Sequence, residues 1–455
     1  MLPAAGAADT KVVTLVGTLQ SALGCASDWV PDCPATRLVS TGGATYQARF
    51  DLPAGSYEYK VTIGGSWAEN YGAGGAQDGP NLGLRLLGPA TVVVSYDDAT
   101  HRIEVAPLTL AGPAGPQDAE LARDGFDPTD KGFFHGGDLR GVIEKLDYLQ
   151  ALGTTAIWLT PSFTNRPVQG SGDDISAGYH GYWTTDFTRI DPHLGTNEDL
   201  AALVAAAHAK GMKVFLDIIT NHTADVLDHA GDRYGYVPKS DRPYRAADGT
   251  PSDDADYASS ATFPDLDPAT SFPYVPTWRT AADATVKVPA WLNDPTMYHH
   301  RGNSTWTGES VTYGDFVGLD DLFTERPEVV EGMIEIYAAW ARTGIDGFRI
   351  DTMKHVNLAF WQRFSPAVLA AARAAGNSEF FMFGEVYDGD PRVTSRYTTT
   401  GRVQATLDFG FQGAALAFAQ GAPTTRLAAF FATDDWYTDT DSNAYGLPTF
   451  LGNHD

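Results

Sequence analysis

The chain has 455 residues and is 43% hydrophobic, enough apolar material for two or three domains with cores of their own. Its formal net charge of −26 argues against nucleic acid and anionic membrane surfaces as partners, because both would repel it. No apolar run is long enough to span a bilayer. We therefore expect a monomer that acts on a neutral substrate.

The first features along the chain indicate secretion. Residues 1–10, MLPAAGAADT, contain the small residues that precede a signal-peptidase cut, and we interpret them as a tail left by a removed signal. The two cysteines, Cys25 and Cys33, lie in one short loop, GCASDWVPDC. In a secreted protein they are expected to form a disulfide. Two free thiols or a metal site remain alternatives, although a metal would need further ligands.

Residues 11–106 are expected to form an N-terminal all-β sandwich. Short β-rich runs alternate there with turns that contain Gly, Asp and Pro. In SYEYKVTI, every second residue from Tyr57 to Ile63 is apolar or aromatic, as expected of a strand with one buried face. Residues 107–124, which begin with a stretch rich in Ala, Gly and Pro, are interpreted as a linker.

Helical patterns alternate with apolar strands in the remaining residues, 125–455. Four times a helical pattern ends at a glycine before an apolar run; these are Gly153 before TTAIWLTP, Gly211 before MKVFLDII, Gly344 before IDGFRID and Gly376 before EFFMFGEV. This repeat indicates a parallel α/β sheet, which GRVQATLDF and LPTFLGNHD are expected to continue. An insert at 223–322, rich in Pro, Asp and aromatic residues, interrupts the pattern after the third expected strand.

Four of the expected strands end in polar residues. These ends are DIITNH at 217–222, GFRIDTMKH at 347–355, FMFGEVYDG at 381–389 and FLGNHD at 450–455. In a parallel barrel the C-terminal ends of the strands meet at one mouth, so Asp351, Glu385 and Asp455 are expected to come together. A lone Arg-x-Asp, like that of Arg349 and Asp351, would be interpreted as a structural salt bridge. Four strands in one series that all end in polar residues favour an active site instead.

The three carboxylates suit glycoside hydrolysis, in which one carboxylate is the nucleophile and another the general acid and then base. Arg349 lies on the same strand face as Asp351, because side chains alternate along a strand, and is expected to keep that aspartate ionised. Glu385 follows the apolar FMFG and lies near two negative charges. Its pKa is therefore expected to be raised, as a general acid requires.

These four segments, in this order and spacing, resemble the signature regions of the α-amylase family of glycoside hydrolases. AGYHGYWTTDF at 177–187 and GLDDL at 318–322 resemble two further segments of the family, and the likeness covers about residues 126–455. The resemblance implies an α/β fold of the (β/α)8 TIM-barrel type, with an inserted domain at 223–322. It also implies a retaining hydrolase that cleaves the α-1,4 bonds of starch-like glucans.

Carried over residue by residue, the resemblance makes Asp351 the nucleophile, Glu385 the acid/base and Asp455 the carboxylate that grips the distorted sugar. It places Lys354 and His355 on the leaving-group side of the bond. The residues that it places around the reacting glucose are His180, Tyr182, His222, Arg349 and His454. Tyr182 among them would stack on the sugar ring.

The resemblance further implies a calcium ion held by Asn221, Asp321 and the backbone oxygen of His355, since hard calcium prefers oxygen ligands. Asp217 is expected to be structural and buried. The first domain is similar to the β-sandwich modules that precede catalytic barrels in pullulanases. In that module, Trp67 and Tyr71 could form either a sugar-binding platform or part of the core.

Two features depart from the family pattern. PLTLAGPAGPQDAELARD offers no apolar strand to open the barrel, and the sequence stops at Asp455, before the eighth strand and the usual C-terminal β-domain. We therefore expect a truncated chain with an incomplete barrel. Two alternatives to α-1,4 hydrolysis remain: α-1,6 cleavage by a pullulanase or amylopullulanase, and glucan binding without turnover. The Lys354-His355 pair favours α-1,4 cleavage, whereas the first domain favours the pullulanase.

Overall fold

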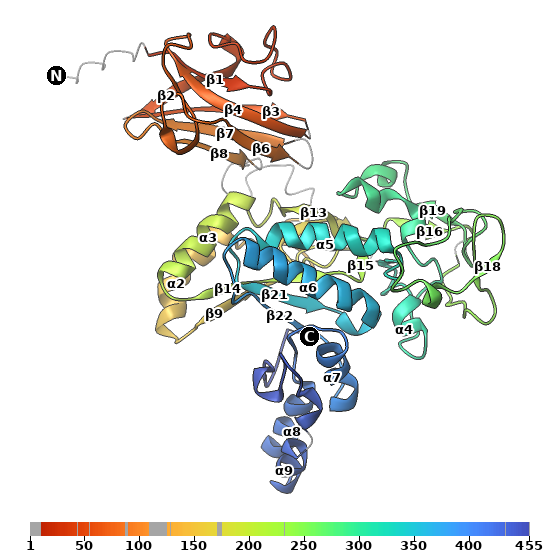
Figure 1. Cartoon of the computed structure of the whole chain (residues 1–455). Helices are drawn as coiled ribbons and strands as arrows, with labels where there is room; N and C mark the ends of the chain where they lie inside the picture. The colour runs from red at the N-terminus through yellow and green to blue at the C-terminus, as the bar shows by residue number, and fades with distance from the viewer. Residues whose placement is uncertain are drawn as a thin grey trace. The chain divides into compact units, whose positions relative to one another are not determined.

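The computed structural model describes most of the chain as two compact units, whose main division falls between residues 114 and 115 (Figure 1). The described residues are 11–42, 44–53, 55–86, 90–108, 125–127, 129–170, 175–231, 233–432 and 434–454. Most of the predicted linker and the last residue, Asp455, lie outside these ranges.

The N-terminal unit is built from antiparallel strands, as predicted. Its described strands are β1 (Val13–Gly17), β2 (Arg37–Gly42), β3 (Thr45–Leu52), β4 (Gly55–Ile63), β5 (Asn70–Tyr71), β6 (Leu82–Leu86), β7 (Ala90–Asp97) and β8 (Ile103–Leu108). They pair in the order β5-β4-β1-β2-β3-β7-β8, and β6 pairs with β4. Side chains of β1 and β4 share one core cluster with side chains of β3 and β7, so the two halves of the sheet pack on each other.

The alternation predicted for β4 is confirmed on its inner face. Tyr59, Val61 and Ile63 are all buried in the core of the unit. Thr62, on the opposite face, is also buried, because a loop covers it and its hydroxyl donates to the carbonyl of Pro31 at 3.0 Å. The predicted disulfide between Cys25 and Cys33 is present in that loop.

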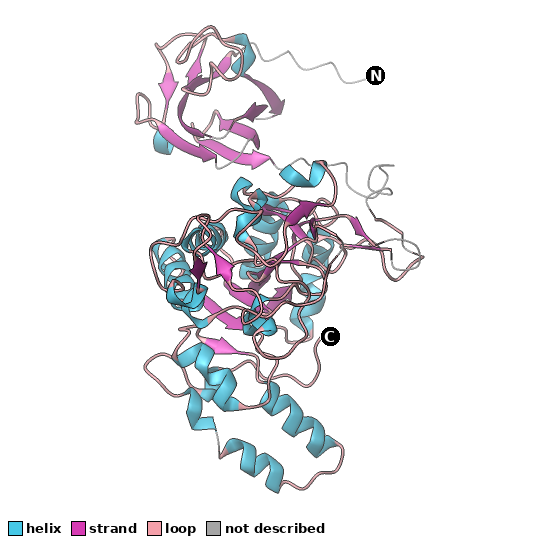
Figure 2. Cartoon of the chain, turned by 90° about the vertical axis from the view of Figure 1, so that its right-hand side faces the viewer, coloured by secondary structure: helices cyan, strands magenta, loops and turns pink. Residues whose placement is uncertain are grey.

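A parallel sheet forms the centre of the second unit. Its described strands are β9 (Ala156–Leu159), β14 (Lys213–Ile219), β21 (Gly347–Asp351), β22 (Phe381–Gly384) and β23 (Ala405–Thr406). They lie side by side in chain order, and each pair of neighbours is parallel. Figure 2 shows helices, in cyan, beside these strands.

The predicted repeat of helix, glycine and strand is confirmed four times. The helices that precede β9, β14, β21 and β22 are α2 (Leu139–Ala151), α3 (Asn197–Ala209), α5 (Pro327–Ala341) and α6 (Leu358–Ala374). The four predicted glycines, at 153, 211, 344 and 376, all have positive φ angles, which explains why glycine ends each helix. Since every repeat returns to the same sheet edge, the polar residues that follow the strands gather there.

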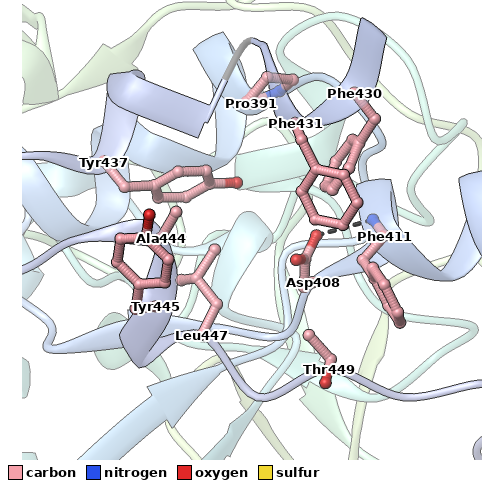
Figure 3. Close-up of a pocket in the computed structure, with 10 residues that line it drawn as sticks. All are labelled: Pro391, Asp408, Phe411, Phe430, Phe431, Tyr437, Ala444, Tyr445, Leu447 and Thr449. Atoms are coloured by element: carbon pink, nitrogen blue, oxygen red, sulfur yellow. Dashed lines mark hydrogen bonds between the residues drawn. The ribbon is translucent and has the colours of Figure 1, made fainter. Parts of the chain in front are cut away.

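The sheet is shorter than predicted at its C-terminal side. GRVQATLDF contributes only the two-residue β23, and LPTFLGNHD forms no strand over the described residues 447–454. Pro448 instead accepts one backbone hydrogen bond from Asp408 at 3.1 Å. Leu447 and Thr449 line an apolar cavity of about 320 Å³ with aromatic side chains such as Phe431 (Figure 3). The described residues thus form an open five-stranded parallel sheet rather than a closed barrel.

The two ends of the insert at 223–322 lie side by side. β15 (His222–Thr223) pairs antiparallel with β20 (Asp320–Asp321), so the two ends of the insert are hydrogen-bonded to each other. Its other described elements are β16 (Leu227–His229), β17 (Tyr244–Arg245), β18 (Pro251–Ser252), β19 (Pro276–Trp278) and α4 (Ser310–Tyr313). Tyr244 and Phe272 of the insert form a small core together with Phe323, the residue that directly follows it.

The remaining described elements connect these parts. They are β10 (Phe163–Asn165), β11 (Val168–Gln169), β12 (Ser176–Ala177), β13 (Thr184–Ile190), α7 (Pro391–Thr399), α8 (Phe409–Ala419) and α9 (Thr425–Phe431). β10 pairs with β13, and β11 pairs with β12, each antiparallel. Among the described parts of the chain, no helix is both long and apolar enough to cross a bilayer.

Candidate active site

The guanidinium of Arg349 is the centre of the site. Its Nη1 lies 2.7 Å from Oδ1 of Asp351, and its Nη2 lies 2.7 Å from Oε2 of Glu385. Nη1 also contacts both carboxylate oxygens of Asp217, at 3.0 and 3.1 Å. One cation therefore contacts three carboxylates, which lie within β14, at the end of β21 and directly after β22.

The backbone of two strands explains how these groups come so close. All five residues of β21 are buried, and Arg349 and Asp351 share one face while Ile350 faces the other way. A Cβ at Gly347 would lie only 1.9 Å from the carbonyl oxygen of Phe381 in the neighbouring strand. A side chain at this position would force β21 and β22 apart, so the glycine permits the close contact between Arg349 and Glu385.

Asp217 is buried, as predicted, and its carboxylate contacts the Arg349 guanidinium. Burial raises the pKa of Asp217, and the Arg349 guanidinium beside it opposes that rise by favouring the ionised carboxylate. Trp158 donates its indole N–H to Oδ2 of Asp217 at 3.0 Å, and its ring lies 5.1 Å from the Arg349 guanidinium. Trp158 was missed by sequence reasoning, although its place at the end of the apolar run AIWL was a usable signal.

Two histidines and a tyrosine line the same cleft. Burial lowers the pKa of His180 to about 4 and that of His222 to about 3, so both rings are neutral at pH 7. His180 Nδ1 accepts the backbone N–H of Tyr182 at 3.0 Å. The hydroxyl of Tyr182 reaches Oδ2 of Asp217 at 3.3 Å. Neutral imidazoles can hydrogen-bond sugar hydroxyls without adding positive charge beside the carboxylates.

Lys354 and His355 follow β21 in a short helical turn, Met353–His355, and both line the cleft. The ammonium of Lys354 donates to Oδ2 of Asp388 at 3.1 Å and to the carbonyl of Tyr387 at 3.0 Å. The ring of His355 is bonded through Nδ1 to the carbonyl of Val311 at 2.7 Å, and burial lowers its pKa. Lys354 is thus hydrogen-bonded to the segment after Glu385, and His355 is hydrogen-bonded to the insert.

The last predicted segment reaches the cleft although its strand does not form. Nε2 of His454 lies 3.0 Å from the hydroxyl of Tyr182, and its ring lies edge-on to Trp158 with centroids 5.7 Å apart. Asn453 lines the cleft beside them. Asp455, the third predicted carboxylate, lies outside the described residues.

The cleft above these groups has a volume of about 660 Å³ and is open to solvent. Asp351 and Glu385 line it together with the predicted residues His180, Tyr182, His222, Lys354 and His355. Aromatic side chains that were not predicted also line it, namely Trp306, Phe316, Tyr387, Phe409 and Phe450. Carboxylates between aromatic walls suit a ring with apolar faces and a polar rim, such as a sugar.

The predicted metal ligands lie where the insert joins the sheet. Asn221 directly precedes β15, and Asp321 is paired with His222 across the ladder. His299 contacts Asp321 at 2.6 Å and Glu325 at 3.0 Å. Burial disfavours the charged imidazolium, but the effect of these two carboxylates is larger than that of burial. Together they raise the pKa of His299 to about 9. Within the described ranges, no group of three His, Cys, Asp or Glu side chains is arranged to hold a metal. A cation here would therefore need amide and backbone oxygens, which calcium accepts.

Sequence comparison matches both units to known families. Residues 116–455 match the alpha amylase catalytic domain, and residues 12–103 match the pullulanase X25 domain. An alpha-amylase of Streptomyces lividans is 60% identical over 334 residues, which is 73% of this chain and 36% of that protein. The chain thus spans about a third of the length of this relative.

More distant relatives share the catalytic part. A cyclomaltodextrin glucanotransferase of Klebsiella oxytoca is 28% identical over 351 residues, covering 72% of this chain and 45% of that protein. Among solved structures, an Anoxybacillus alpha-amylase superposes with a TM-score of 0.51 at 31% identity. That superposition covers 72% of this chain and 57% of the other.

Proposed function

The chain belongs to the α-amylase family of glycoside hydrolases, and from this premise we propose that it hydrolyses α-1,4-glucosidic bonds in starch-like glucans with retention of configuration. The observation that carries the proposal is the pair of cleft carboxylates, Asp351 and Glu385, bridged by the single guanidinium of Arg349. Two carboxylates held this close suit retention, because an inverting pair must leave room for a water between them and the sugar.

In the proposed reaction, Asp351 attacks the anomeric carbon while the bond to the leaving-group oxygen breaks and Glu385 gives that oxygen a proton. The sugar is then bonded to Asp351. Glu385, now a carboxylate, takes a proton from a water whose oxygen attacks the same carbon, which releases the sugar and restores both side chains. Arg349 stays charged throughout, because the three carboxylates around it outweigh its burial and raise its pKa.

The proposed test is product analysis on amylose and on pullulan, with the anomer of the first product followed by NMR. New reducing ends from amylose, appearing first as the α-anomer, would support retaining α-1,4 hydrolysis. First release of the β-anomer would contradict retention. Absence of cleavage by folded protein would favour the glucan-binding alternative.

Cleavage of α-1,6 bonds is the second candidate, and the match of residues 12–103 to the pullulanase X25 domain is the observation that favours it. The same assay separates the two candidates, because pullulan contains both linkages. Maltotriose as the end product would indicate α-1,6 cleavage, whereas products that retain α-1,6 bonds would indicate α-1,4 cleavage.

We further propose a calcium ion that binds at Asn221, Asp321 and the backbone oxygen of His355. The support is the chemistry of these donors, which are all oxygens, and the place of Asn221 and Asp321 at the closed base of the insert. Calcium there would hold the insert, and with it His355, against the sheet. We also propose that the protein is secreted and acts as a monomer; the Cys25–Cys33 disulfide supports secretion, since such bonds persist in oxidising compartments.

A further inference from the structure

Two tryptophans lie together on neighbouring loops of the N-terminal unit. The ring centroids of Trp29 and Trp67 are 6.3 Å apart, with 36° between the ring planes. Trp67 is 43% exposed, and Trp29 is partly exposed. Each ring thus keeps apolar surface in water although a packed core lies in the same unit.

The loop that carries Trp29 is built around a buried glutamine. Gln20 is fully buried, and its amide accepts the N–H of Val30 at 2.7 Å and donates to the carbonyl of Val30 at 2.9 Å. The Cys25–Cys33 disulfide closes the same loop. Trp29 itself has a φ of 61°, in the left-handed region that residues other than glycine rarely adopt. The indole is therefore held in place by its surroundings rather than left to a flexible loop.

Trp67 and Tyr71, the two aromatic residues of one segment, differ in their burial. Tyr71 is 8% exposed, belongs to the core cluster and stacks on His101 with centroids 3.9 Å apart. Tyr71 therefore has a packing role. Trp67 lies outside that cluster, so packing alone does not account for it.

The charge around the pair restricts what can bind there. The two described segments that carry the indoles, 20–36 and 64–78, contain no lysine or arginine but include acidic residues such as Asp32 and Glu69. The acidic side chains of these segments disfavour an anionic ligand, and carboxylates can accept hydrogen bonds from hydroxyls. A pyranose ring has an apolar face for an indole and a rim of hydroxyls for these acceptors.

We propose that Trp29 and Trp67 form a platform in the N-terminal unit that binds the same class of α-glucan as the cleft of the catalytic unit. The choice of ligand rests on the proposed function. Because the two rings are inclined rather than coplanar, they suit two successive sugars of a curved chain. Such a platform keeps the enzyme on an insoluble polymer between cleavage events.

Binding of the full chain to granular starch tests the proposal, with Glu385→Gln in every protein to prevent turnover. Trp67→Ala is expected to weaken binding about 3- to 10-fold, as loss of one aromatic contact does, and Trp29→Ala to do the same. Trp67→Phe should recover part of the loss. Tyr148→Ala is the matched control, because Tyr148 is 62% exposed on α2 and is expected to leave binding unchanged. Thermal unfolding confirms that each variant is folded.

If Trp67→Ala and Trp29→Ala both bound starch as tightly as the parent, the proposal would be overturned. It would also be overturned if the protein bound cellulose as tightly as starch and the binding to cellulose depended on Trp67. With Glu385 intact, Trp67→Ala should leave KM for a short maltooligosaccharide unchanged, because such a substrate fills only the cleft. The experiments test the platform through starch binding and the cleft through glucan cleavage, so one proposal can fail without the other. Loss of starch binding in a chain that cleaves no glucan would support the platform and contradict the proposed function.

Discussion

Asp217 and Arg349 are paired across neighbouring parallel strands and joined by a buried ion pair, with Nη1 of the arginine 3.0 and 3.1 Å from the two carboxylate oxygens. The same guanidinium contacts Asp351 and Glu385. Asp217 therefore sets the position of the one cation that holds both candidate catalytic groups. Its effect on the reaction is indirect, since it acts through Arg349.

Asp217→Asn is expected to lower kcat about 10- to 100-fold and to change KM little, because a small displacement of Arg349 moves both carboxylates away from their productive positions. Steady-state kinetics on a soluble maltooligosaccharide give both constants. The matched control is Asp191→Asn, another buried aspartate, whose carboxylate is bonded to His193 and to the backbone of Asn165. Equal losses in the two variants would show that Asp217 has only a general structural role.

Asp351→Asn is expected to lower the turnover rate by several orders of magnitude while leaving glucan affinity largely intact, because the amide keeps the shape of the side chain but is a poor nucleophile. Rate measurements and calorimetric titration with a maltooligosaccharide check the two halves of this prediction. A variant with near-normal turnover would remove Asp351 from the nucleophile's role.

Removal of calcium is expected to lower the melting temperature and the activity together, because a ligand that binds only the folded protein stabilises it. The measurement is thermal unfolding and activity in excess chelator, followed by addition of calcium or of magnesium. Calcium alone should restore both values. Asn221→Ala should make the melting temperature insensitive to calcium, and a melting curve that the chelator leaves unchanged would contradict the proposed metal.

Acidification below pH 6.5 is expected to destabilise the protein through its buried histidines. The pKa of His222 is lowered to about 3 by burial, so between pH 6.5 and 3 the unfolded chain binds a proton that the folded chain does not. The contribution of neutral His222 to stability is therefore complete above pH 6.5 and falls as the pH decreases. At pH 5 the loss from His222 alone is about 2 kcal/mol. Denaturant unfolding at pH 7.5 and at pH 5 gives the loss in the free energy of unfolding between the two pH values. This loss should be smaller by that amount in His222→Asn than in the parent protein.

Reduction of the Cys25–Cys33 disulfide is expected to destabilise the N-terminal unit by about 2 to 3 kcal/mol, the cost of releasing a short closed loop in the unfolded chain. The paired replacement Cys25→Ser and Cys33→Ser should have the same effect. Unfolding monitored by tryptophan fluorescence measures it. If the loop positions Trp29 as proposed, the double variant should also bind granular starch less tightly.

Much of the fold follows from local patterns. The alternation in β4 and the repeated sequence of helix, glycine and strand predict elements whose apolar residues can be buried in only one way. The final run, LPTFLGNHD, has a suitable apolar pattern, but its described residues, 447–454, form no strand. A strand needs hydrogen-bonding neighbours as well as a pattern, and these described residues make one backbone hydrogen bond to the segment after β23, at Asp408.

The sequence by itself determined the candidate catalytic chemistry, because Arg349, Asp351 and Glu385 follow apolar runs whose C-terminal ends must meet at one edge of a parallel sheet. Only the tertiary structure decided that Asp217 and Trp158 support the same guanidinium, and that Tyr71 is buried while Trp67 is exposed. The physical reason is that strand order, register and loop packing bring together residues far apart in sequence. Local propensity and alternation carry no information about those distances.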